Sequence, residues 1–127
     1  YYNGAPSVPN RPYEGQCILL IDGLSGSASV NLAAGFRMSE IGPIYGQPCL
    51  GPMTGTWGNP APESLNNSGI NIFISTIRFN ADRNFNTSAE PIAPDVLIVP
   101  EPSLMIENRD AVLERVLMDL KQKRNTP

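Results

Sequence analysis

The chain has 127 residues, of which 41% are apolar, so it is long enough and apolar enough to form one domain with a core. Its net charge of -3 and the absence of a long basic run argue against nucleic acid as the main partner. It contains no His, which excludes metal sites built on His and a Ser-His-Asp triad assembled from this chain alone. No apolar run approaches the roughly 20 residues of a membrane span, and we expect neither a metal nor a cofactor.

The first half of the chain predicts one βαβ unit. Residues 1–16, rich in Pro, Gly and Asn, predict an extended lead-in that continues an upstream part of the same polypeptide. Residues 17–21 form an apolar run that ends at Asp22-Gly23, which predicts a strand buried on both faces of a parallel sheet. The apolar spacing over residues 30–39 predicts a crossover helix, and residues 44–46 predict the second strand.

The second half predicts loops, two strands and a closing helix. Residues 47–68, rich in Gly, Pro and Asn, predict a long loop. Alternating apolar residues over 70–79 predict a strand, residues 80–93 predict a polar loop, and residues 96–99 predict a short strand. Asn108 is expected to cap the closing helix. The apolar stripe of that helix consists of Val112, Leu113, Val116, Leu117 and Leu120.

Residues 24–29, Leu-Ser-Gly-Ser-Ala-Ser, are mostly small and predict a turn between the first strand and the first helix. Gly and Ala let a backbone turn sharply and let a substrate approach closely. A Ser at such a turn is presented at the edge of the sheet, and the N–H after it, together with the helix N-terminus, can stabilise an oxyanion. From the pattern alone, the same residues also predict a plain turn in which Ser27 or Ser29 caps the helix.

The segment over residues 11–34 resembles the core of the tail-specific (S41-type) serine peptidases. In that family a Pro-Tyr-x-Gly lead, present here at residues 12–15, precedes an apolar strand, a serine-rich motif and an Ala-rich helix. Ile-Ala-Pro-Asp-Val at 92–96 resembles a second family segment, and the likeness runs in order over roughly residues 11 to 123. It implies an α/β fold, the Clp-protease/crotonase-like βαβ spiral in partial form with a closing C-terminal helix, with residues 17–127 as the C-terminal portion of the peptidase domain.

The same resemblance implies a site. Ser27 aligns with the family's nucleophile, and Ala28 aligns with the residue whose amide joins the oxyanion hole. The implied activity is hydrolysis of peptide bonds by acyl transfer in a peptide or protein substrate, without a cofactor, in an extracytoplasmic location.

The chain departs from the family pattern at two positions. Val30 stands where the motif has Glu, and Pro52 stands where many members carry a Lys general base, so a Ser-Lys dyad is not available. A segment without Lys, such as Gly-Pro-Met at residues 51–53, is normal in the branch that resembles tricorn and the chlamydial secreted protease, in which a His far upstream and a Glu after the Ser complete the site. Glu90 is the nearest match to that Glu, and Glu63 is the alternative.

Two other functions stay open. Val30 and Pro52 favour an inactive pseudo-peptidase that binds peptides or proteins, whereas the retained Ser27 speaks against it. The second alternative is a crotonase-like acyl-CoA enzyme, which uses backbone amides rather than a Ser nucleophile. Because no general base is present, we expect the isolated chain to be inactive on peptides.

Two smaller features carry expectations of their own. Cys17 and Cys49 are predicted at opposite ends of the sheet, too far apart for a disulfide. Trp57 is interpreted as a loop side chain that covers the core, with a position lining a peptide groove as the alternative.

Overall fold

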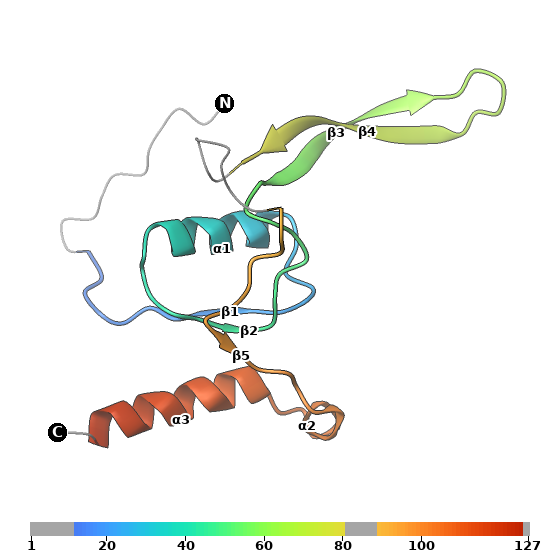
Figure 1. Cartoon of the computed structure of the whole chain (residues 1–127). Helices are drawn as coiled ribbons and strands as arrows, with labels where there is room; N and C mark the ends of the chain where they lie inside the picture. Colours follow the sequence, from blue (N-terminus) through green and yellow to red (C-terminus); the bar gives the residue numbers. More distant parts are fainter. Residues whose placement is uncertain (1–11, 81–88, 126–127) are drawn as a thin grey trace.

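The computed structural model describes residues 12–80 and 89–125, which form an α/β fold (Figure 1). A parallel three-stranded sheet has the order β1-β2-β5, where β1 is Leu19–Ile21, β2 is Ile44–Gly46 and β5 is Val96–Leu97. Because the strands are parallel, their carboxyl ends lie together at one edge of the sheet. The predicted βαβ unit is therefore confirmed, with β2 at the predicted residues.

The main core lies between this sheet and α1, which spans Ala28–Met38. Small and apolar residues recur on one face of α1 at helical spacing, so that the helix can approach the sheet closely. The buried cluster consists of Ile21, Val30, Ala33, Ala34, Phe36, Ile44, Cys49 and Ile92. Two of these, Cys49 and Ile92, come from the segments that follow β2 and precede β5.

The other face of the sheet is covered by α3, which spans Ala111–Asn125 (Figure 1). Successive residues of a strand point to opposite faces of a sheet. Accordingly, Ile44 belongs to the cluster under α1, whereas the hydroxyl of Tyr45 donates a hydrogen bond of 3.2 Å to Asp119 of α3. Val116 is the buried residue of the predicted apolar stripe.

The prediction for the first strand was partly wrong. The strand begins at Leu19 rather than Cys17, and Leu20 is 39% exposed. The reason is that β1 lies at the edge of the sheet while α3 packs against β2. The strand that is buried on both faces is β2, in which all three residues are buried.

A β-hairpin projects away from this core (Figure 1). Its strands β3, Thr56–Ser64, and β4, Asn71–Phe79, are antiparallel. The predicted strand over 70–79 is confirmed, but the predicted loop over 47–68 was wrong because it contains β3. Its prolines indicated a loop, although an edge strand tolerates Pro on its unpaired side. Most of the predicted loop over 80–93 lies outside the described residues.

The C-terminal part differs from prediction in two details. A short helix α2, Pro102–Ile106, follows β5 and was not predicted. The predicted cap Asn108 is wrong, since Asp110 caps α3 by accepting hydrogen bonds from the N–H groups of Val112 and Leu113 at 2.9 and 3.0 Å. In the part of the chain that the structure describes, no helix is long and apolar enough to cross a membrane.

Candidate active site

The turn between β1 and α1 is closed by its own side chains. The carboxylate of Asp22 accepts hydrogen bonds from the N–H of Leu24 at 3.0 Å and from the hydroxyl of Ser25 at 2.8 Å. The N–H of Asp22 in turn donates to the Ser25 hydroxyl at 3.1 Å. These local bonds fix the path of the chain as it leaves the sheet, which the sequence pattern did not reveal.

Ser27 holds an unusual backbone conformation within this turn. Its φ is 51° and its ψ is -115°, close to the first central residue of a type II′ turn, a position that Gly normally occupies. The N–H of Ser29 donates to the carbonyl of Gly26 at 3.0 Å, which closes the tight turn around Ser27. A side chain in such a sparsely populated region is strained by on the order of 1–3 kcal/mol, and such strain concentrates at functional sites.

The side chain of Ser27 does not serve as a helix cap. It occupies the N-cap position of α1 but makes no capping hydrogen bond, so the plain-cap interpretation is wrong for Ser27. Ser27 is also exposed. The next amide, that of Ala28, begins α1 and donates to no other residue within 12–80 and 89–125. An exposed hydroxyl and an unpaired N–H therefore lie on adjacent residues at a helix N-terminus, where the helix dipole favours negative charge.

An open pocket of about 260 Å³ adjoins Ser27. It combines the β1–α1 turn, the segment after β2 and the base of β3. The lining residues are Gly26, Ser27, Val30, Leu50, Gly51, Thr56 and Trp57. The site thus offers a mainly apolar surface directly beside the hydroxyl.

Hydrogen bonds between distant segments hold the walls of this pocket together. The N–H of Leu50 donates to the carbonyl of Ser25 at 3.0 Å. The side-chain amide of Asn31 in α1 donates to the hydroxyl of Thr56 in β3 at 3.2 Å. The base of the hairpin is therefore fixed against the helix that begins at Ser27, and the sequence analysis missed both Leu50 and Thr56 as pocket residues.

Trp57 does not cover the core as interpreted from the sequence. It is 63% exposed because it stands on β3, and it lines the Ser27 pocket. The guanidinium of Arg78 lies over the indole ring, 5.7 Å from the ring centroid, and donates a hydrogen bond to the carbonyl of Thr54 at 3.0 Å. This cation–π contact restrains the indole that lines the pocket.

The two candidate carboxylates lie outside that pocket. Glu90 lines a separate depression with Arg37 and Met53, and no residue lines both depressions. Glu90 is nevertheless two residues from Ile92, whose N–H donates to the carbonyl of Gly51 at 3.3 Å. Glu63 pairs with Ile72 near the tip of the hairpin. It is seven residues along β3 from Thr56, which corresponds to roughly 23 Å of strand.

The two cysteines are free, as predicted. Cys49 is buried, and burial, followed by the negative charge of Asp22, raises the pKa of its thiol. Raising the pKa disfavours the reactive thiolate. Cys49 is therefore a core residue rather than a competing nucleophile beside Ser27.

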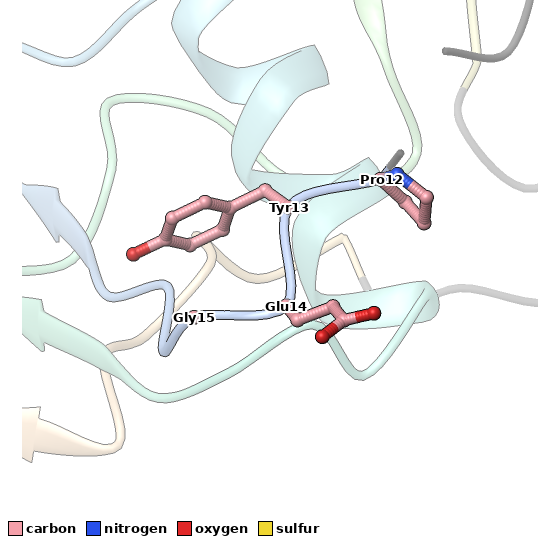
Figure 2. Close-up of a pocket in the computed structure, with 4 residues that line it drawn as sticks. All are labelled: Pro12, Tyr13, Glu14 and Gly15. Carbon is pink, nitrogen blue, oxygen red and sulfur yellow. The ribbon is translucent and has the colours of Figure 1, made fainter. Parts of the chain in front are cut away.

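A further cavity lies in the lead-in segment, where Figure 2 shows its lining residues Pro12, Tyr13, Glu14 and Gly15. The exposed ring of Tyr13 lies beside Gly15. Because these four residues are consecutive and exposed, the cavity is a local feature of one loop. None of them lines the Ser27 pocket.

Among the residues that the structure describes, no group of three or more His, Cys, Asp or Glu side chains is placed to hold a metal ion. What the arrangement offers chemically is a hydroxyl, a backbone donor and an apolar pocket. A comparison with the models of known protein families finds no match, and no curated protein matches the chain either.

Proposed function

We propose that this chain supplies the nucleophile-bearing part of a serine peptidase, similar to the tail-specific family. The observation that carries the proposal is the strained, exposed Ser27 at a strand-to-helix turn, with φ of 51° and no capping hydrogen bond. A Ser in an ordinary turn gains nothing from such a conformation, whereas a nucleophile held on a sharp strand-to-helix turn is presented to the substrate. The parallel β1–α1–β2 unit also supports the Clp-protease/crotonase-like spiral in partial form.

The proposed chemistry is acyl transfer. The Ser27 hydroxyl attacks the substrate carbonyl, its oxygen forms a bond to the carbonyl carbon, and a general base takes its proton. The Ala28 N–H stabilises the oxyanion. The C–N bond then breaks as the base returns the proton to the leaving amine, and water hydrolyses the acyl-serine in a second cycle.

The general base lies outside residues 1–127 in this proposal. The chain has no His, and its only lysines, Lys121 and Lys123, stand on α3, on the other side of the sheet from α1 (Figure 1). Pro52 has no amine to offer. A His from an upstream part of the polypeptide takes the proton, and Glu90 orients it, both by resemblance to the tricorn-like branch. The extracytoplasmic location rests on the same resemblance.

A fluorophosphonate probe tests the proposal on the longest natural polypeptide that contains this chain. We expect labelling that Ser27→Ala abolishes. Ser29→Ala is the matched control, because Ser29 is exposed on the same turn, and it should keep the labelling. Labelling that survives Ser27→Ala contradicts the proposal, as does activity on an acyl-CoA substrate that Ser27→Ala leaves unchanged. The purified 127-residue chain should not hydrolyse peptides, because it lacks the base.

A peptide-binding pseudo-peptidase is the second candidate. The observations that favour it are Val30 and Pro52, which stand where the family pattern has a Glu and many members a Lys, and the exposed indole of Trp57 beside an apolar pocket. A folded polypeptide that resists the probe, yet changes its Trp57 fluorescence when peptide is added, would support binding without hydrolysis. Trp57 is the only Trp in the chain, so the signal is specific within it.

A further inference from the structure

The β3–β4 hairpin exposes large apolar side chains along β4. Every residue of β4 is exposed, and Phe73 and Ile74 are 70% and 52% exposed. An isolated two-stranded hairpin is only marginally stable in water, and a long apolar edge strand is a template for pairing with another chain. The hairpin is therefore an incomplete sheet.

The hydrogen-bond pattern shows that the outer edge of β3 is blocked. At the hairpin end, the N–H of Leu65 donates to the carbonyl of Ile70 at 2.9 Å. Since bonded and non-bonded pairs alternate along an antiparallel ladder, Glu63 and Ala61 also face β4. Pro60 and Pro62 alternate with them and face outward, where they present no N–H. A further strand would find two donors missing on this edge.

Among residues 12–80 and 89–125, no strand pairs with the outer edge of β4. Asn71, Phe73 and Ser75 lie opposite Ser64, Pro62 and Pro60 in the non-bonded pairs, so their N–H and carbonyl groups point away from β3. The surrounding segment, Ile-Asn-Ile-Phe-Ile-Ser-Thr-Ile at residues 70–77, contains no charge, no Pro and no Gly. Such a composition is typical of segments that associate through their edges.

We propose that this edge pairs, antiparallel and across a two-fold axis at Phe73, with β4 of a second copy of the chain. Residues 71–75 are Asn-Ile-Phe-Ile-Ser, so the order of polar, aliphatic and aromatic residues is the same in both directions along the chain. In this register Phe73 meets Phe73 of the second copy, Ile72 meets Ile74, and Asn71 meets Ser75. Phe thus meets Phe, Ile meets Ile and one uncharged polar residue meets another, so no like charges face each other. The three pairs whose backbone groups point outward form about six backbone hydrogen bonds.

The blocked edge explains why the pairing ends at two copies. Pairing through β4 produces a four-stranded sheet of the order β3-β4-β4-β3. Both outer edges of that sheet are then β3 edges, each carrying Pro60 and Pro62. Prolines at an edge disfavour the addition of further strands. The same hairpin thus favours a closed dimer over an open fibre.

The first test is the molar mass of the 127-residue chain by sedimentation velocity over a range of concentrations. The wild-type chain should dimerise, and Ser75→Pro should weaken dimerisation on the order of tenfold or more, because it removes two outward N–H donors per dimer. Ser75→Ala is the matched control, since it keeps the N–H. A wild-type chain that stays monomeric at its highest soluble concentration, or that grows into open-ended aggregates, overturns the proposal.

The second test separates loss of pairing from loss of folding. Phe73→Lys places two like charges at the two-fold axis and should give a monomer, as should Phe73→Glu. Mixing the two variants should restore a mixed dimer at low salt, because opposite charges then face each other at the axis. If the mixture stays monomeric while both variants keep the wild-type far-ultraviolet circular dichroism, the register about Phe73 is refuted.

Discussion

Replacing Ser27 with Gly tests the strain at the proposed nucleophile directly. Gly adopts φ of 51° and ψ of -115° freely, whereas Ser there is strained by on the order of 1–3 kcal/mol. The gain is partly offset, because Gly leaves the unfolded chain more freedom, which costs roughly 0.5–1 kcal/mol. We therefore expect Ser27→Gly to raise the free energy of unfolding by about 1 kcal/mol.

Ser27→Ala is the matched control for this measurement. Ala keeps the Cβ that causes the strain, and the hydroxyl that it removes makes no capping hydrogen bond. Its free energy of unfolding should stay within about 0.5 kcal/mol of the wild type. In urea unfolding followed by circular dichroism, the midpoint of Ser27→Gly should lie about 0.5 M above that of both other proteins. A Ser27→Gly midpoint at or below that of Ser27→Ala would show that the backbone is relaxed, and the main support for a nucleophile would be lost.

Two further predictions concern the sheet beneath the site. Gly46 has φ of 124°, and an added Cβ would overlap the carbonyl oxygen of Ile21, so Gly46→Ala should lower the free energy of unfolding by about 2 kcal/mol or more. Gly35→Ala is its control, since an added Cβ at Gly35 meets no other atom and should stabilise α1 by roughly 0.5–1 kcal/mol. If both substitutions change the urea midpoint equally, the predicted overlap at Gly46 is contradicted. Burial, and then the hydrogen bond to Asp119, raise the pKa of Tyr45, so the folded state favours the neutral phenol. The stability that this phenol contributes is present below the unfolded pKa of about 10 and is lost as pH rises through the folded pKa. Tyr45→Phe should flatten the alkaline fall in urea midpoint, and identical slopes for the two proteins would exclude this origin.

The elements that could be predicted from the sequence are those whose signals are local. The apolar run before Asp22, the small residues at 24–29 and the helical spacing after them are contiguous, and together they placed Ser27 at a strand-to-helix turn. The backbone strain at Ser27 has no such signal. It depends on how the turn must close between a strand and a helix that are packed together.

The features that were missed depend on contacts between distant segments. β3 was read as a loop because Pro60 and Pro62 are loop signals, and only the pairing with β4 reveals that they occupy an edge. Trp57 was misplaced for the same reason. Asp95 belongs to the segment that resembles the peptidase family. Its carboxylate accepts a hydrogen bond of 2.8 Å from the N–H of Ile44, 51 residues away, and forms an ion pair of 3.0 Å with Arg37. Its role in joining β5 to β2 and α1 is invisible in the linear pattern.

The hairpin segment leaves the core and rejoins it at nearly the same place. The N–H of Cys49 donates to the carbonyl of Ile92 at 2.9 Å, and Pro52 forms a bridge with Pro91. Because the two ends already meet, the core is insensitive to the number of residues between them, and doubling such an excursion adds only about 0.6 kcal/mol of closure entropy. A shortened or exchanged hairpin would thus leave the scaffold under Ser27 connected as before, while removing one wall of its pocket.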